Sequence, residues 1–218
     1  MRTFNLKGPV LILPIGYPGA GKTYFSRNFA ESNNFVHLQE DLIRNRLYSK
    51  PSYSKEENEH IEQVIDLMME LFLDNGKSVV LDSNLIKAKD RKAKREIAND
   101  YKARVITVWI QTDLDTAFDR ASNRDRRRID EKYARNLNKE EFNSVIESLQ
   151  RPAREDYAVI SGKHDYKIQQ NTVYKKFEML GYLRPASPAN KTISGPQKIS
   201  PKTNLGGRVD LARRADKF

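Results

Sequence analysis

The sequence predicts a domain of the α/β class, in which helices cover both faces of a parallel β-sheet. Short apolar runs alternate along the chain with longer helical segments, an order typical of parallel strands joined by helical crossovers. The first run, Val10–Leu13, is apolar at every position, as in a strand buried on both faces. The length of 218 residues fits one domain of about 150–200 residues plus an additional segment.

The predicted elements follow one another in a regular order. Five strands are predicted, at residues 10–13, 35–38, 78–81, 104–110 and 157–160. Helices are predicted at residues 22–31, 41–48, 87–100, 114–122, 139–149 and 171–180. A further long helix is predicted to begin at Ser54, whose spacing from Glu57 indicates a capping box, and to end at Gly76.

The net charge of +10 is concentrated near the carboxyl terminus. Residues 184–218 contain eight basic and two acidic side chains, with four prolines and no apolar period. Because such a segment buries too little surface to offset its ordering entropy, it is predicted to be disordered, with room for a short helix over Val209–Ala215. The chain is therefore divided into a folded domain, 1–183, and a basic tail, 184–218. Without aromatic residues before Phe218, the tail is expected either to contact nucleic-acid phosphates weakly or to be inert.

The composition also excludes several classes of function. The chain has no cysteine, which excludes thiol catalysis, cysteine-ligated zinc and iron–sulfur clusters. The longest apolar run near the amino terminus, Pro9–Ile15, is about a third of what spans a bilayer, and no cleavage site follows it. The expectation is a soluble, cytoplasmic protein that does not contact a membrane.

The most specific motif follows the first strand. Residues 16–23 read G-Y-P-G-A-G-K-T, a phosphate-binding loop that opens a helix. Its glycines let backbone N–H groups surround phosphate oxygens, and the helix N-terminus faces the same anion. The residues predicted to bind ATP are Gly16, Pro18, Gly19, Ala20, Gly21, Lys22, Thr23 and Tyr24. Lys22 is expected to reach the β- and γ-phosphates, and the Thr23 hydroxyl to ligate Mg²⁺.

Two further groups lie where a second substrate would meet the nucleotide. The third strand ends in Asp82, followed by Ser83 and Asn84, and Asp82 is placed to hold Mg²⁺ or its bound water. Motor ATPases commonly carry a glutamate directly after this aspartate, so Ser83 favours transfer to a bound acceptor. After the second strand, Asp41 and Arg44 share one helix face, where a carboxylate could take a proton and a guanidinium could hold an anion.

Two clusters of basic residues stand out. Five arginines lie within nine residues, at positions 120, 124, 126, 127 and 128. Arg120 and Arg124 are expected to act from a lid as stabilisers of the transferring phosphoryl group, whereas the other three are expected to be solvated. Six cations between Lys87 and Arg95 are expected to form the solvated face of a polar helix.

Taken together, these motifs resemble the P-loop kinases of the polynucleotide kinase and zeta toxin-like group, within the AAA-type ATP-binding domain family. The resemblance covers about residues 9–180 and rests on the order of the P-loop, the D-x-x-R, the D-[ST]-N and the R-x-x-x-R motifs. It implies a P-loop NTPase three-layer fold with a five-stranded parallel sheet of order 2-3-1-4-5 and a helical, arginine-rich lid. It also implies that Asp41 is the general base, that Arg44 helps hold the acceptor's phosphate, and that Arg120 and Arg124 contact ATP. Asp82, Ser83 and Asn84 match the family's D-[ST]-N residues.

The predicted function is transfer of the γ-phosphoryl group of ATP, with Mg²⁺, to a hydroxyl group of a small molecule or of a polynucleotide 5′ end. Glu40 stands where polynucleotide kinases can carry a basic residue, which weakens the polynucleotide option. Two alternatives stay open: a nucleotide-gated ATPase that binds nucleic acid without an acceptor, and a kinase of nucleotide sugars resembling zeta toxins. The sequence leaves the acceptor, the oligomeric state and an antitoxin partner undetermined.

Overall fold

The computed structural model of the chain describes residues 6–184. The predicted tail therefore lies outside the described residues apart from Arg184, as does the short helix predicted over Val209–Ala215. Within the described part, no helix is both long enough and apolar enough to cross a membrane.

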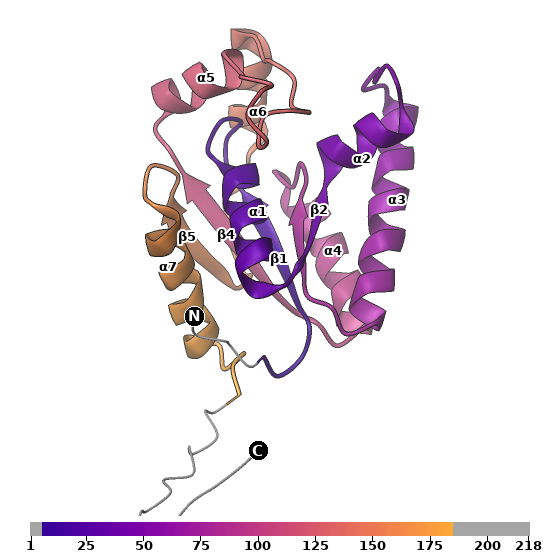
Figure 1. The fold of residues 1–218 in the computed structure, drawn as a ribbon, viewed down its shortest axis with the longest axis vertical. Coiled ribbons are helices and arrows are strands. Elements are labelled where there is room, and N and C mark those ends of the chain that lie inside the picture. Colours follow the sequence, from indigo (N-terminus) through magenta and orange to yellow (C-terminus); the bar gives the residue numbers. More distant parts are fainter. Residues whose placement is uncertain (1–5, 185–218) are drawn as a thin grey trace, which may run out of the picture. The chain divides into compact units, whose positions relative to one another are not determined.

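A five-stranded, entirely parallel sheet forms the centre of the domain (Figure 1). Its strands, in chain order, are β1 (Val10–Ile15), β2 (Val36–Gln39), β3 (Val79–Asp82), β4 (Arg104–Gln111) and β5 (Tyr157–Ser161). They lie side by side in the order β2-β3-β1-β4-β5. The predicted fold class and the strand order implied by the family resemblance are therefore confirmed, and the protein has the P-loop NTPase fold.

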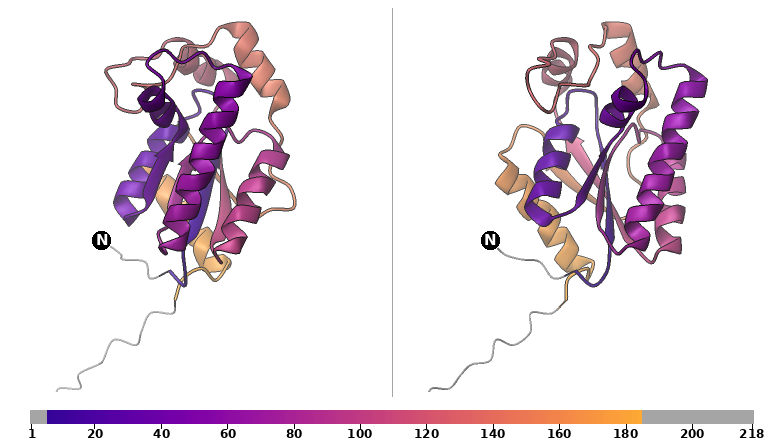
Figure 2. Two further views of the ribbon diagram at one scale, coloured as in Figure 1. Left: turned by 90° about the vertical axis from the view of Figure 1, so that its right-hand side faces the viewer. Right: turned by 45° about the vertical axis from the view of Figure 1, so that its right-hand side comes forward.

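Helices cover both faces of this sheet. The helices are α1 (Lys22–Asn33), α2 (Glu40–Leu47), α3 (Lys55–Asp74), α4 (Ala88–Asp100), α5 (Leu114–Ser122), α6 (Lys139–Ser148) and α7 (Tyr166–Met179). Figure 2 shows α1 and α7 on one side of the sheet and α3 and α4 on the other. Because β1 is buried on both sides, its alternate residues enter two separate cores: Ile12 packs with Phe25 and Phe177, whereas Leu13 packs with Ile65 and Met69.

The remaining elements lie beyond the carboxyl ends of the strands (top of Figure 1). There α5 and α6 pack on each other through Phe118 and Phe142, whose ring centroids are 5.2 Å apart. The segment that joins these two helices carries the arginine-rich sequence. In an open parallel sheet, ligands bind at this carboxyl edge.

Three local predictions need correction. Only half of the capping box forms: the Ser54 hydroxyl accepts the Glu57 N–H (3.2 Å), but the Glu57 carboxylate turns to Ser52 and Arg44. The last helix begins at Tyr166, five residues earlier than predicted. The apolar pattern did not reveal its first turns, because they place a polar residue, Gln169, on the buried face. There the Gln169 amide donates a hydrogen bond to the Ser161 carbonyl (2.9 Å).

The third correction concerns the basic face of α4, which is not solvated throughout. Arg91 and Lys94 are buried in ion pairs, and Glu155, itself buried, accepts hydrogen bonds from Arg91, Arg95 and Thr107. Lys94 pairs with Glu62 and Asp66 on α3. These pairs attach α4 to α3, to β4 and to the segment before β5.

Replacing Glu155 by Gln is expected to lower the free energy of unfolding by about 3–5 kcal/mol, because it leaves the buried Arg91 guanidinium without its carboxylate. Denaturant unfolding measures the loss. Glu96→Gln is the matched control, since it removes an exposed pair with Lys92 and should change the midpoint little. Equal losses in both variants would contradict the structural role of Glu155.

Candidate active site

The P-loop connects the end of β1 to the beginning of α1. Residue 21 occupies the N-cap position of α1 and makes no side-chain cap, so the first-turn N–H groups of the helix face the loop. Gly21 has φ of 100° and Gly19 has φ of 78°, values in the left-handed region that only glycine adopts without strain. A Cβ at Gly19 would overlap the carbonyl oxygen of Ala117, so glycine also lets the loop pack closely on α5. This backbone geometry suits the anion cradle predicted from the motif, whose binding of phosphate stays a prediction.

Lys22 holds the two ends of the loop together. Its Nζ donates hydrogen bonds to the carbonyl oxygens of Gly16 (3.0 Å) and Tyr17 (3.1 Å). Burial lowers the pKa of Lys22 to about 8, although the carboxylates of Asp82 and Asp41 act in the opposite direction. A phosphate group entering the loop would supply the negative charge that the buried ammonium group needs.

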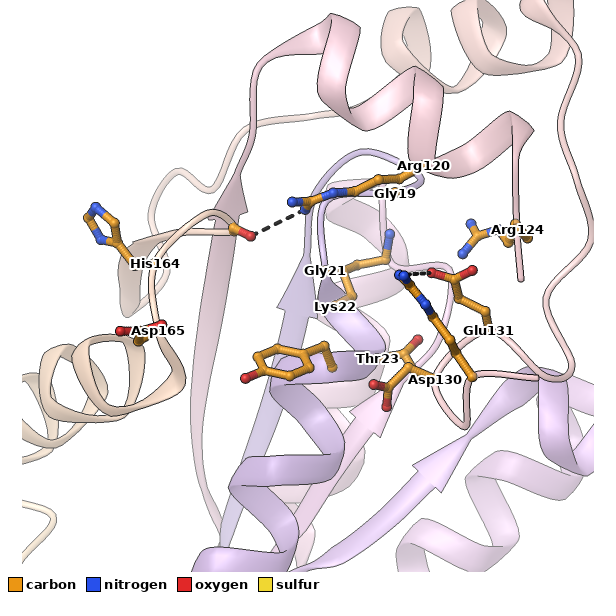
Figure 3. Close-up of a pocket in the computed structure, with 13 residues that line it drawn as sticks. Gly19, Gly21, Lys22, Thr23, Arg120, Arg124, Asp130, Glu131, His164 and Asp165 are labelled. Atoms are coloured by element: carbon orange, nitrogen blue, oxygen red, sulfur yellow. Dashed lines mark hydrogen bonds and ion pairs between the residues drawn. The ribbon is translucent and has the colours of Figure 1, made fainter. Parts of the chain in front are cut away.

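A cavity of about 360 Å³ lies on one side of the loop, a volume within the range of small-molecule sites (Figure 3). We call it the donor cavity; its lining comes from the P-loop and α1, from the lid between α5 and α6, and from the turn after β5. These residues are Gly19, Gly21, Lys22, Thr23, Tyr24, Arg120, Arg124, Arg128, Asp130, Glu131, Gly162, His164 and Asp165. Arg120 is fixed across it by a hydrogen bond from its Nη1 to the Gly162 carbonyl (3.3 Å).

A second cavity, of about 380 Å³, lies on the other side of the loop. We call it the acceptor cavity; the end of β2, α2, the end of β3 and the lid segment around Arg135 line most of it. Three residues line both cavities: Lys22, Thr23 and Arg124. The two cavities therefore meet at the lysine of the P-loop, beneath an arginine of the lid.

Asp41 lies in the acceptor cavity, in the first turn of α2. Its carboxylate makes no hydrogen bond to any other described residue, and it comes near enough to Lys22 to influence the ammonium charge. Burial, together with the neighbouring charges of Glu40 and Asp82, raises the pKa of Asp41 to about 6. A partly buried, unpartnered carboxylate with a raised pKa is suited to accept a proton near neutral pH.

Asp82 ends β3 beside the same cavity, and its partner had not been predicted. His37 on β2 places its Nε2 atom 3.5 Å from Asp82 Oδ2, and both atoms are buried without a hydrogen-bond partner among the described residues. Asp82 and Thr23 both line the acceptor cavity, and a carboxylate with a hydroxyl is an oxygen set that suits Mg²⁺, which needs only one or two protein ligands in addition to phosphate and water. No group of three or more His, Asp or Glu side chains in the described part could bind a metal alone.

Arg44 is placed differently from a free anion-binding arginine. Its Nη1 donates to Glu57 (2.6 Å) and its Nη2 to Glu40 (2.8 Å), and the side chain is 2% exposed. Arg44 lines the acceptor cavity with its charge already compensated, so its contact with an acceptor's phosphate stays a prediction.

The other predicted residues are divided between the two cavities. Tyr24 lines the donor cavity, whereas Gly16 and Pro18 line the acceptor cavity. Ser83 and Asn84 also line the acceptor cavity, and the Asn84 N–H donates to Glu40 (3.0 Å). Ala20 is buried and lines neither cavity.

Several cavity residues had no sequence signal. The donor cavity adds Asp130, Glu131, His164 and Asp165, and the acceptor cavity adds Gln39, Tyr53 and Arg135. They come from turns, from the lid and, for Gln39, from the last position of β2, where no period or motif marks them. Asp130 accepts two hydrogen bonds from Arg27 on α1 (2.7 and 3.2 Å), which attaches the lid to the core.

Comparison with known proteins is consistent with this geometry. The profile of the AAA domain family matches residues 11–152, which include the P-loop, Asp41, Asp82 and Arg124. No curated protein matches the chain in sequence.

Solved structures match over most of the chain at low sequence identity. A gluconokinase from Sinorhizobium meliloti 1021 is 13% identical, with a TM-score of 0.56, over 81% of this chain and 94% of that one. The APS kinase CysC of Mycobacterium tuberculosis, solved with AMPPNP and APS, is 16% identical, with a TM-score of 0.58, over 78% and 98%. Kti12 of Chaetomium thermophilum, solved with ADP-AlF3, is 14% identical, with a TM-score of 0.56, over 80% and 100%. These likenesses show the fold.

Proposed function

The chain belongs to the AAA domain family, and from this membership and its paired cavities we propose that it transfers the γ-phosphoryl group of ATP to a hydroxyl group. We further propose that residues 1–183 carry this activity and that the basic tail, residues 184–218, lies outside the catalytic domain.

The observation that carries the proposal is the meeting of two cavities at Lys22, Thr23 and Arg124. A hydrolase needs only a nucleotide site and a water, whereas a transferase needs a second cavity for the acceptor. Here the second cavity is as large as the first and is lined by a partly buried carboxylate, Asp41. In the proposed reaction, an acceptor hydroxyl in the second cavity would approach the terminal phosphate from the side opposite ADP.

The residues then divide the chemistry between them. Asp41 takes the proton of the acceptor hydroxyl as the oxygen–phosphorus bond forms and the bond between the γ-phosphorus and the β–γ bridging oxygen breaks. Lys22, Arg120 and Arg124 stabilise the negative charge that spreads over the transferring group. Thr23 and Asp82 would hold Mg²⁺, which neutralises phosphate charge when bound.

The proposal is tested by a transfer screen with ATP labelled at the γ-phosphate. The acceptors offered are sugars, polyols, sugar acids, nucleosides, and RNA and DNA with 5′-hydroxyl ends. The expected result is label transferred to one acceptor class, with ADP formed in equal amount and only when the acceptor is present. Hydrolysis that nucleic acid stimulates, without labelled product, would instead favour the nucleotide-gated ATPase.

A further inference from the structure

The acceptor cavity has many hydrogen-bonding groups but little uncompensated positive charge. Building on the proposed function, we propose that its acceptor is a neutral, non-aromatic polyhydroxyl compound, such as a sugar or a cyclic polyol. A polynucleotide end or a sugar acid would need free cations, and a nucleoside would need a stacking surface.

The first argument concerns Arg44. Both Nη groups of this arginine are taken by the carboxylates of Glu40 and Glu57, and its Nε is buried without a partner. Glu57 is held in turn by the Ser52 N–H and hydroxyl (2.6 and 2.7 Å), so this carboxylate cannot easily turn away. These contacts hold the pKa of Glu57 at about 2. One guanidinium is therefore balanced by two carboxylates, and an anionic acceptor gains little from it.

The second argument concerns Arg135, the one cation that the lid contributes to the acceptor cavity besides Arg124. Its Nη1 donates to Glu141 on α6 (2.6 Å), which compensates this charge as well. The remaining cations, Lys22 and Arg124, also line the donor cavity, where the phosphates of ATP would neutralise them. An anionic acceptor would then be repelled by the carboxylates of Asp41 and Glu40, and no unpaired cation among the described residues of the acceptor cavity would compensate for this repulsion.

The third argument concerns stacking. Tyr53 is the one aromatic residue among those lining the acceptor cavity, and its backbone has φ of 56°, in the left-handed region. The Arg44 guanidinium lies 4.7 Å from the centre of its ring and the Arg135 guanidinium 5.2 Å. A base that stacked on Tyr53 would therefore have to compete with two guanidinium groups for the ring, which disfavours an aromatic acceptor.

The remaining polar side chains of the acceptor cavity are suited to form hydrogen bonds with hydroxyl groups. The side chains of Gln39, Ser83 and Asn84 line the cavity and make no hydrogen bond to any other described residue. Amides and hydroxyls both donate and accept, as sugar hydroxyls do. Apolar side chains of Ile86, Leu137 and Val145 also line the cavity and could cover the C–H face of a sugar or cyclic polyol.

The test compares acceptor classes with the full chain at saturating ATP. Hexoses, pentitols and inositol are the neutral probes, the corresponding sugar acids are the anionic probes, and adenosine and a 5′-hydroxyl oligonucleotide are the aromatic probes. The expected result is transfer to a neutral probe with a kcat/KM about tenfold or more above that of its acid. Preference for an acid, for adenosine or for the oligonucleotide would overturn the inference while leaving phosphoryl transfer intact. If ATP binds but no probe accepts label, the proposed function fails, and the inference with it.

A charge variant tests the same inference inside the protein. Glu141→Gln releases Arg135 yet keeps a residue that can complete the capping box with Asn138 at the start of α6. The freed guanidinium is expected to raise kcat/KM for the sugar acid by about tenfold, the value of one charge-assisted hydrogen bond, with less than about a threefold change for the neutral probe. Adding Arg135→Gln should remove this gain. A Glu141→Gln protein whose preference for neutral over acidic probes is unchanged would overturn the charge argument.

Discussion

Replacing Asp41 by Asn is expected to lower the rate of phosphoryl transfer by about 10²–10⁴-fold, while the affinity for ATP stays within about threefold of the wild type. Asn keeps the shape of the side chain but cannot accept the proton of the acceptor hydroxyl. The nucleotide contacts survive because Asp41 lines the acceptor cavity and not the donor cavity. Steady-state kinetics with the acceptor identified in the transfer screen, together with titration of a non-hydrolysable ATP analogue, measures the two quantities separately.

The same group sets the pH dependence. Because burial and the charges of Glu40 and Asp82 raise the pKa of Asp41 to about 6, the carboxylate is ionised above pH 6 and protonated below it. We expect kcat/KM of the wild type to fall about tenfold per pH unit as the pH drops below this value. The residual activity of Asp41→Asn should lack this acidic limb.

A matched control is available on α5. Asp115→Asn changes an exposed carboxylate in the first turn of that helix, outside both cavities, and is expected to keep the wild-type rate and pH profile. Full activity in Asp41→Asn would remove the proposed base, and loss of rate and of ATP affinity by the same factor would assign Asp41 a structural role instead.

The strands and the P-loop could be predicted because their determinants are local, whereas the order of the strands was implied by the family resemblance. Continuous apolar runs identify buried strands, and the glycines of the P-loop specify a backbone that Gly19 and Gly21 adopt in the structure. The start of α7 could not be predicted, because a buried Gln169 interrupts the apolar period and its partner, the Ser161 carbonyl, lies in the preceding strand. Periodicity assigns a polar side chain to solvent, whereas a single tertiary hydrogen bond can bury it.

In the candidate site, too, local motifs could be predicted from the sequence, whereas tertiary contacts could not. Residues within a motif, such as Lys22 and Asp82, were found, but the partners that tertiary structure brings to them were not. His37 reaches Asp82 because β2 and β3 are neighbours, with Gln39 paired to Asp82 in the parallel register. The strand order implied by the family resemblance contained that signal, since it places the ends of these two strands side by side.

The charges of the site were the least predictable feature. Arg44 and Arg91 look alike in the sequence, as basic residues on polar helices, yet each is buried with carboxylates that lie 13 and 64 residues away. Net charge by segment cannot reveal such compensation, because it depends on which loop crosses which helix. This is why we base the proposed acceptor class on the structure and not on the composition.

Among the lid residues, Arg124 is the one whose replacement should lower the rate of phosphoryl transfer most. It follows the end of α5, is among the three residues that line both cavities, and keeps its Nε buried without a hydrogen-bond partner in the described part of the chain. Burial lowers the pKa of Arg124, and the charges of Asp41, Glu131 and Asp82 oppose that shift, so the guanidinium stays protonated at neutral pH. A partly buried cation between the donor and acceptor cavities is suited to stabilise a transferring phosphoryl group.

Arg124→Ala is therefore expected to lower kcat by about 10³–10⁵-fold, the range found for arginines that contact the transferring phosphoryl group. The KM for ATP should rise far less, because the interaction strengthens as charge develops in the transition state. Arg127→Ala is the matched control: this arginine belongs to the same basic cluster but is exposed, pairs with Asp125, lines neither cavity and should keep the wild-type kcat. A loss confined to ATP affinity, or one shared by Arg127→Ala, would show that the lid contributes only general positive charge to the nucleotide site.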